Sequence, residues 1–179
     1  MRVYPLKPDL KRYSTFSVEG QVPENFFWEF DGRSHAKDWK TITVSAADED
    51  DAAVALPDFA FIGVLPAFNV PAVDVLLPVL RPNGELLPVR HRRAEYMLYN
   101  VTRVADALDE ESSVVKRFSG TGDVMKVEKF AFRPEVVRAL EVFRIPQLLR
   151  GHVFVTDPFV TLVEANGLTG FDLSAVWSV

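Results

Sequence analysis

Hydrophobic residues along the first half of the chain follow the patterns of short strands. An aromatic residue stands at each even position from 26 to 30, and this alternation predicts a strand. Residues 39–44 form another β-rich run, and the stretch at 72–80 is apolar enough to predict a buried strand. Residues 86–89 and 96–101 add two further strands. The first half is therefore predicted to be rich in β-structure.

A hairpin is the clearest β-signal of the second half. Strands are predicted at 114–118 and 124–132, on either side of the loop Ser-Gly-Thr-Gly at 119–122. Met125 and Val127 share one face of the second strand, whereas the phenylalanines at 130 and 132 have the opposite parity. A β-bulge near residues 128–129 would bring both pairs to the same face.

Helix signals lie between and after these strands. Residues 45–48 read Ser-Ala-Ala-Asp, which fits a helix start, and this helix would end before Pro57. Residues 102–111 predict a short helix or a turn, because apolar residues recur there at helical spacing. Pro134 suits the first position of another short helix that runs to about residue 140.

The last helix has the strongest helical signal in the sequence. Asp157 is its predicted N-cap and is followed by a proline, while Gly167 is the predicted residue just after its C-terminus. Residues 159, 162 and 163 form its apolar stripe. Together the elements predict an α+β fold with a largely antiparallel sheet, a few short helices and a C-terminal helix.

Length and composition indicate one globular domain, or two closely packed halves. The chain has 179 residues, 48% of them hydrophobic, and a domain of this size buries roughly 70% of the surface of its unfolded chain. The absence of cysteine excludes disulfide scaffolds and thiolate metal sites. The longest uncharged stretch, 59–73, is too short to cross a bilayer, and the N-terminus lacks a signal-peptide pattern. We therefore expect a cytoplasmic protein without membrane contact.

Charge gives the first indication of a partner. The formal net charge of −5 argues against direct binding of nucleic acid. Residues 41–80 contain six acidic residues and neither lysine nor arginine, and a second acidic cluster follows at 106–111. Such clusters can steer a basic partner, although the first also suits the opening turn of a helix. The candidate binding residues are Asp48, Glu49, Asp50, Asp51, Asp106, Asp109, Glu110 and Glu111.

Catalytic motifs are missing from the sequence. It contains no phosphate-binding loop, no GxGxxG, no GxSxG and no HExxH. Its three histidines are isolated from one another. Asp106 and Asp109 would share one face of a helix and could serve a hydrolase with His91 or His152, but a solvated turn or a cap is the preferred explanation of the pair. We therefore predict no catalytic residue, no cofactor and no metal.

Three blocks of the sequence resemble a bacterial family known as immunity protein family 11. Residues 95–109 resemble its block YxxxNVxxxxDALD. Phe130–Pro134 and the following Val142–Pro146 are similar to the next block, and residues 153–159 and 167–171 are similar to the last. Each block alone is short, and the order and spacing of all three make the resemblance specific.

This resemblance implies a cytoplasmic antidote of a polymorphic-toxin or contact-dependent competition system. Such proteins bind a cognate toxin domain, often a nuclease, and neutralise it by occlusion, without chemistry of their own. The toxin gene is expected next to the immunity gene. We expect specificity to lie in a variable N-terminal part of the domain, about 1–84, and the family resemblance to cover about 85–179. A non-enzymatic adaptor or effector chaperone of a secretion system is the alternative.

Overall fold

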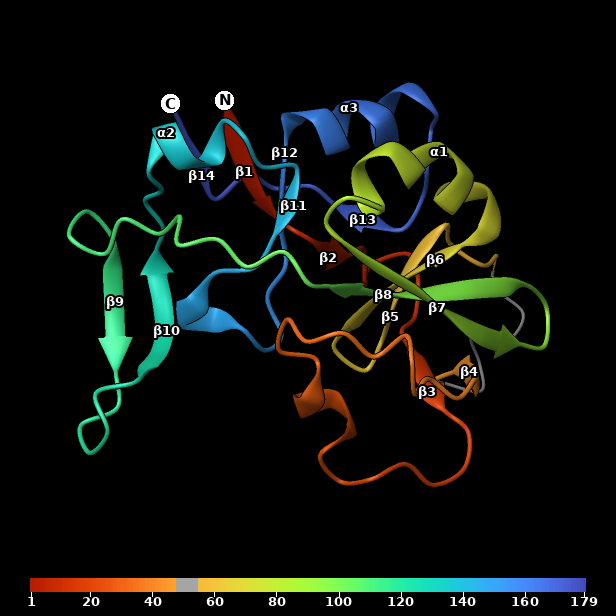
Figure 1. The fold of residues 1–179 in the computed structure, drawn as a ribbon. Coiled ribbons are helices and arrows are strands. Elements are labelled where there is room, and N and C mark those ends of the chain that lie inside the picture. The colour runs from red at the N-terminus through yellow and green to blue at the C-terminus, as the bar shows by residue number, and fades with distance from the viewer. Residues whose placement is uncertain (48–54) are drawn as a thin grey trace.

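A closed barrel of six strands occupies the right-hand half of the molecule in Figure 1. The computed structural model describes residues 1–47 and 55–179. Around the barrel the order is β3-β4-β7-β8-β6-β5, and β5 returns to β3. The β3–β5 and β4–β7 pairs are parallel and the other four are antiparallel. The strands are β3 (Phe16–Val18), β4 (Ile42–Ala46), β5 (Phe59–Ile62), β6 (Leu65–Asn69), β7 (Gly84–His91) and β8 (Glu95–Val101).

The predicted strands at 86–89 and 96–101 are confirmed as β7 and β8. The run at 39–44 is confirmed in part, because β4 begins at Ile42 and continues through Ala46. The predicted helix start at Ser45 is therefore wrong: this residue belongs to a strand that pairs with β3. The remainder of that predicted helix falls mostly on residues 48–54, which lie outside the described residues.

The stretch 72–80 is a helix, not the predicted strand. Helix α1 spans Val70–Leu80. A largely apolar run does not distinguish a buried strand from a buried helix, and here the residues before the run decide. The Asn69 side chain accepts a hydrogen bond from the Ala72 backbone N–H at 2.9 Å, and Pro71 suits the first turn. These two residues start a helix on the outer face of the barrel.

The strand predicted from the aromatic alternation at 26–30 is also wrong. Residues Phe26–Glu29 form a short 3₁₀ helix, η1. Phe26 packs edge-on against Phe30, and Phe30 is buried in the barrel core although it lies outside the barrel strands. A 3₁₀ helix has three residues per turn, so it does not keep the two-residue period of a strand. Trp28 therefore points outward and does not share a buried face with Phe30.

A second sheet combines the two ends of the chain, with the order β11-β12-β1-β14. Its strands are β1 (Arg2–Pro5), β11 (Val142–Phe143), β12 (Phe154–Thr156) and β14 (Trp177–Ser178), all paired in antiparallel fashion. A separate pair joins β2 (Lys7–Pro8) to β13 (Phe171–Asp172). The N-terminal strand therefore lies inside a sheet that residues 142–178 otherwise form.

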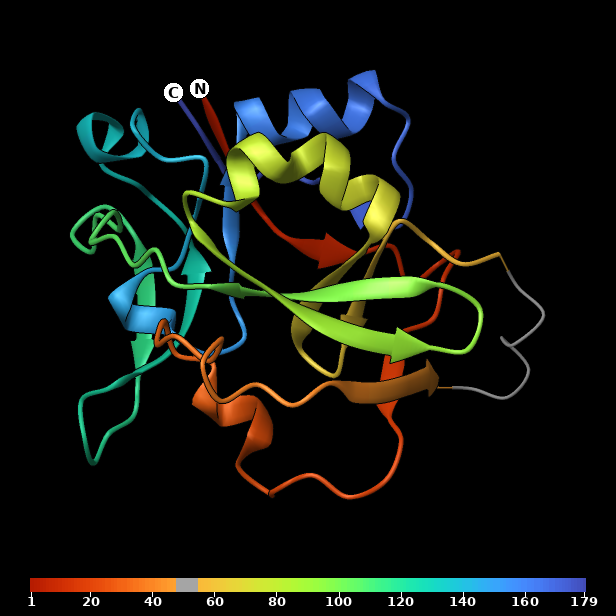
Figure 2. The ribbon, with the colours of Figure 1, turned by 45° about the vertical axis from the view of Figure 1, so that its right-hand side comes forward.

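Helix α3 (Asp157–Ala165) confirms the predicted C-terminal helix and lies beside α1 above the barrel (Figures 1 and 2). Phe159 of α3 is fully buried among Phe68 of β6 and Phe171 of β13. Gly167 follows the helix with a positive φ of 61°, as a helix stop requires. The N-cap position belongs to Thr156, however, and Asp157 is the first helical residue.

The predicted hairpin is confirmed as β9 (Val114–Arg117) and β10 (Val124–Lys129), which stand at the left of Figure 1, although the second strand ends at Lys129 and not at the predicted residue 132. Its register shifts between Val127 and Lys129, where the bulge was predicted. Helix α2 follows and is shorter than predicted, at Pro134–Val137. The short 3₁₀ helix η3 spans Pro146–Leu148.

Residues 102–111 do not form a helix. They run as an extended segment that exchanges backbone hydrogen bonds with Arg144 at 2.9 Å and ends in a turn at 110–112. The mostly antiparallel strands and the three α-helices of the described residues confirm the predicted α+β class.

Candidate binding surface

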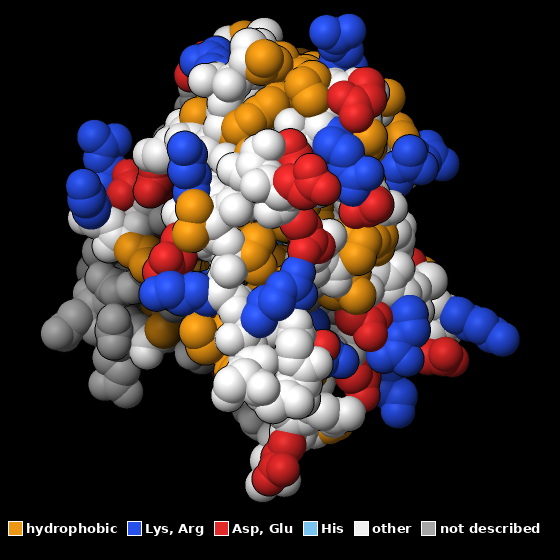
Figure 3. Space-filling view, turned by 90° about the vertical axis from the view of Figure 1, so that its left-hand side faces the viewer, with side chains coloured by type: hydrophobic (Ala, Val, Ile, Leu, Met, Phe, Trp, Pro, Cys, Tyr) orange, Lys and Arg blue, Asp and Glu red, His pale blue; other side chains and the backbone are white. Residues whose placement is uncertain are grey.

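The acidic cluster predicted at 106–111 is largely engaged within the molecule. A carboxylate oxygen of Asp106 lies 2.8 Å from the Arg133 guanidinium. Glu110 forms an ion pair with Arg117 and accepts a hydrogen bond from the Gln147 side chain at 2.8 Å. Figure 3 shows acidic and basic side chains interspersed over this face. Neighbouring cations therefore weaken the negative field that the sequence alone suggests.

Asp109 has a local structural role. Its side chain accepts hydrogen bonds from the backbone N–H groups of Glu111 and Ser112 at 3.1 and 3.2 Å, which fixes the turn that ends this segment. Hydrogen bonds from Ser112 are the main reason why the pKa of Asp109 lies below its usual value. Glu111 is exposed beside it. The first predicted cluster, Asp48 to Asp51, lies outside the described residues.

The hydrolase arrangement considered for Asp106 and Asp109 does not assemble. Asp106 faces Arg133, whereas the Asp109 side chain is occupied by its own turn. His91 stacks on Phe16 at the barrel, with a centroid distance of 5.0 Å, and His152 lies over the phenyl ring of residue 154. The four groups thus lie against different parts of the fold and do not share one reactive centre.

A hollow of about 300 Å³ lies between η1, the β5–β6 turn and the segment after η3. We call it the Trp28 hollow. Its lining residues are Phe27, Trp28, Gly63, Val64, Arg150 and Gly151. The Trp28 side chain is 61% exposed and Val64 is 47% exposed. Sequence reasoning missed this site because the strand assigned to 26–30 turned Trp28 toward the core, and because only the fold brings 28, 64 and 150 together.

A longer groove of about 850 Å³ lies beside it and shares Gly63. Lys7–Arg12 line one part of this groove and Phe171–Ser174 another, together with Thr15 and Phe61. Leu10 is 65% exposed there. The Asp9 carboxylate lies 3.7 Å from the Arg12 guanidinium. The two hollows thus place exposed apolar side chains next to basic ones.

Buried polar groups hold the loop that follows η1. Glu85 of β7 accepts hydrogen bonds from the His35 backbone N–H, from the Ser34 hydroxyl at 2.8 Å and from the Asn100 side chain at 2.8 Å. Burial acts to raise the pKa of Glu85, but these hydrogen bonds outweigh it and hold the pKa below its usual value. The carboxylate therefore stays charged and fastens this loop to the barrel.

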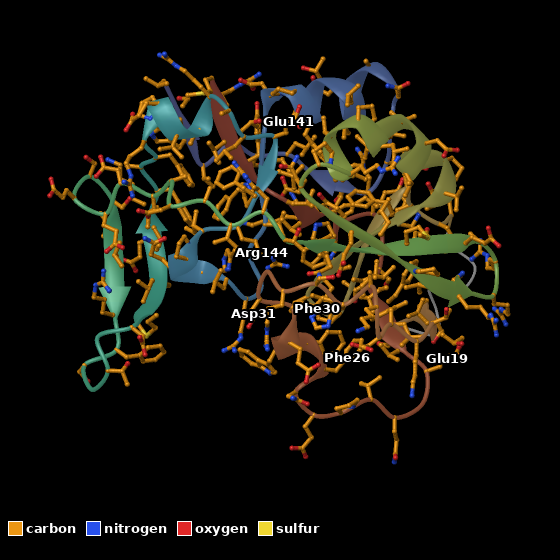
Figure 4. All side chains as sticks on the ribbon, viewed as in Figure 1. Glu19, Phe26, Phe30, Asp31, Glu141 and Arg144 are labelled. Carbon is orange, nitrogen blue, oxygen red and sulfur yellow. The ribbon has the colours of Figure 1, made fainter. Side chains whose placement is uncertain are left out.

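Arg144, in the family-like half of the chain (about 85–179), holds β8 and the segment after η3 together. Its side chain is almost fully buried, and burial lowers the pKa of Arg144 to about 10. The guanidinium donates to the backbone carbonyls of Val101 at 3.1 Å, Leu149 at 2.7 Å and His152 at 3.5 Å. Figure 4 shows Asp31 on the neighbouring N-terminal loop, beside the region of Arg144. This arginine thereby fixes the segment that carries Arg150.

A protein-family model for an immunity protein family, Imm11, matches residues 88–178. The chain belongs to this immunity protein family. The match begins inside β7 and covers β8 and the hairpin through to β14, so it spans about half of the chain. No curated protein matches the sequence. Membership in Imm11 confirms the resemblance noted in the sequence and indicates a role in immunity to a toxin.

The matched blocks lie mainly in scaffold positions of this Imm11 chain. Asn100 is buried and tied to Glu85, and Leu108 packs in the core beneath the hairpin. In the described part of the chain, no helix has the length and apolar character needed to cross a bilayer. Residues 1–47 and 55–179 hold no group of three or more His, Cys, Asp or Glu side chains that could bind a metal ion.

Proposed function

We propose that this Imm11 protein is a cytoplasmic, non-enzymatic immunity protein that binds one cognate toxin domain and neutralises it by occlusion. The family match over residues 88–178 carries the proposal. The toxin is delivered by secretion or cell contact and encoded by an adjacent gene. The engagement of Asp106, Asp109 and Glu110 in ion pairs and turns argues against a hydrolytic role for these carboxylates.

We further propose that the toxin is a nuclease and that the acidic residues contribute to its capture. A nuclease carries a basic surface for phosphate groups, and the net charge of −5 on this chain is complementary to it. Asp48, Glu49, Asp50 and Asp51 would supply most of this attraction, since Asp106 and Glu110 already face Arg133 and Arg117. Glu111 would add a smaller share.

Co-expression with the product of the neighbouring toxin gene tests the proposal. We expect the full chain to restore growth of cells that express the toxin domain, and the two purified proteins to elute together in size-exclusion chromatography. Equal growth with and without the chain, together with separate elution, would contradict the proposal. Co-purification from the native host with a secretion component, and not with a toxin, would favour the adaptor alternative.

A further inference from the structure

We propose that the Trp28 hollow is the contact site for an apolar side chain of the cognate toxin, with toxin carboxylates at its edge. This inference rests on the proposed immunity function and adds the surface and the chemistry of its partner. The hollow is lined by residues 27, 28, 63 and 64 from the N-terminal half and by residues 150 and 151 from the C-terminal half.

The composition of the hollow suits a protein contact. Tryptophan and arginine are enriched among the residues that dominate binding energy at interfaces, and both meet here. The Trp28 side chain is 61% exposed, Val64 is 47% exposed, and the Phe27 ring lies close to Gly63 in the same lining. Exposed apolar side chains occur singly on any protein surface. These line a shared concavity that can take a side chain.

Trp28 is held in place before any partner arrives. The Arg150 Nε donates a hydrogen bond to the Trp28 carbonyl at 2.9 Å, and its guanidinium lies 5.8 Å from the centre of the indole ring. Position 63 requires glycine, because a Cβ there would come within 2.7 Å of the Phe27 ring and because its φ of 60° favours glycine. The absence of a side chain at this position lets the Phe27 ring lie close to the backbone of the β5–β6 turn. A preformed aromatic contact loses little side-chain entropy when it binds.

Charge around the two hollows indicates the partner's chemistry. The cations are Lys7, Lys11, Arg12 and Arg150, and the anions are Asp9 and Asp172. Asp9 faces Arg12, and Asp172 accepts a hydrogen bond from Ser174. The ion pairs within residues 1–47 and 55–179 include neither of the two lysines nor Arg150. This face is locally basic in a chain of net charge −5, so it fits carboxylates on the partner.

The position of the hollow in the chain fits a role in selecting one toxin. The family model begins at residue 88, whereas Phe27, Trp28, Gly63 and Val64 all precede it. Arg150 and Gly151, within the match, anchor Trp28 from the other side. A surface built mainly outside the matched stretch can differ between members while the shared scaffold supports it.

Matched substitutions test the inference with the purified chain and the toxin domain encoded beside it. Trp28→Ala is expected to weaken binding at least ~30-fold, mostly through faster dissociation, as loss of a central aromatic contact does. Val64→Ser should weaken binding several-fold. The controls are Phe118→Ala and Val114→Ser on the hairpin, whose side chains are 52% and 48% exposed, and they should bind within about 2-fold of wild type. Circular dichroism checks that all four variants fold.

The outcomes separate this inference from the proposed function. If the wild-type chain binds and protects but Trp28→Ala and Val64→Ser equal the controls, the hollow is not the contact site and the immunity function stands. Loss of binding only in the hairpin variants would place the contact on the hairpin and overturn the inference. If the wild type alone sediments as a dimer that Trp28→Ala dissociates, a second copy occupies the hollow. Failure of the wild type to bind overturns both proposals.

Discussion

Arg144 shows how one residue can join two parts of the molecule. Its guanidinium donates to carbonyls of β8 and of the segment 149–152, and its side chain is 1% exposed. Burying a cation is costly, and only the hydrogen bonds around it offset that cost. No sequence pattern predicts this role, because the carbonyls belong to positions 43 residues before and 5 to 8 residues after the arginine.

Replacement of this arginine should destabilise the fold. In Arg144→Met the carbonyls of Val101, Leu149 and His152 lose their donor, while the buried charge also disappears. Since an unsatisfied buried group costs about 1–3 kcal/mol, we expect the free energy of unfolding to fall by about 2–4 kcal/mol. Urea denaturation followed by tryptophan fluorescence measures the change. Arg138→Met, at an exposed position, is the control, and equal stability of the two variants would disprove the role.

Asp157 links the C-terminal helix to the N-terminal strand. Its carboxylate accepts hydrogen bonds from the Arg2 backbone N–H and the Tyr4 hydroxyl, both at 3.0 Å, and pairs with the Arg2 guanidinium. Burial acts to raise the pKa of Asp157, but these contacts outweigh it and lower the pKa. The sequence suggested that Asp157 is the N-cap of a helix that starts at residue 158. The helix starts at Asp157 itself, and the carboxylate of this residue contacts Arg2 and Tyr4 of β1.

The lowered pKa predicts how Asp157 contributes with pH. Folding favours the ionised form, so the contribution is present above the unfolded pKa of about 4 and is lost as pH falls through the folded pKa. Asp157→Asn should lower the free energy of unfolding by about 1 kcal/mol at pH 7, a modest value because the site is partly exposed. The difference from wild type should shrink in titrations below about pH 4. The exposed Glu24→Gln variant should show no such trend, and a pH-independent difference for Asp157→Asn would refute the ionic contribution.

At the scale of elements, local signals predicted some structures and long-range contacts decided others. The hairpin has its own turn residues, and α3 has a proline in its first turn and Gly167 after its end, so both could be read from the sequence. The runs at 72–80 and 26–30 could not: the first is apolar at every position except Asp74, and the second forms a 3₁₀ turn because Phe30 enters the barrel core. Segment 102–111 has helical spacing but is extended, since Arg144 offers it backbone partners.

Helix α3 should be a main source of stability. Phe159 is fully buried against Phe68 and Phe171, where α3 meets the barrel and β13. Phe159→Ala should cost about 3–5 kcal/mol of unfolding free energy, as other buried phenylalanine truncations do. Phe118→Ala removes the same atoms from a half-exposed site and should cost far less. A thermal unfolding midpoint for Phe159→Ala close to that of Phe118→Ala would show that this packing is wrong.

At the scale of the molecule, the class and family were accessible from sequence, but the barrel and the Trp28 hollow were not. The barrel closes through a single parallel pair between Phe16 of β3 and Ile62 of β5, which are 46 positions apart in the chain. The hollow likewise needs positions 28, 64 and 150 to meet. Contacts between residues so far apart in the chain produce no hydrophobic periodicity in the sequence. The local pattern around each partner is compatible with many folds and does not identify the other partner.

Whole-molecule charge gives the last prediction, which concerns the rate of toxin capture. Replacing Asp48, Glu49, Asp50 and Asp51 by their amides changes the net charge from −5 to −1. Charges steer association over a Debye length of about 8 Å at physiological salt. If the toxin is basic, the variant should associate several-fold more slowly, with a flatter salt dependence, whereas the dissociation rate should stay near wild type.

The matched control removes four exposed acids elsewhere, at Glu24, Asp38, Glu95 and Glu135, and so produces the same net charge. Surface plasmon resonance at several salt concentrations compares the two variants. If both variants slow association equally, the attraction comes from net charge and the acidic stretch at 48–51 has no special role.

If the variant of the acidic stretch associates faster than wild type, the facing toxin surface is acidic. Capture would then depend on basic residues of the Trp28 hollow and of the neighbouring groove, such as Arg150 and Lys11, whose replacement by glutamine should slow association instead.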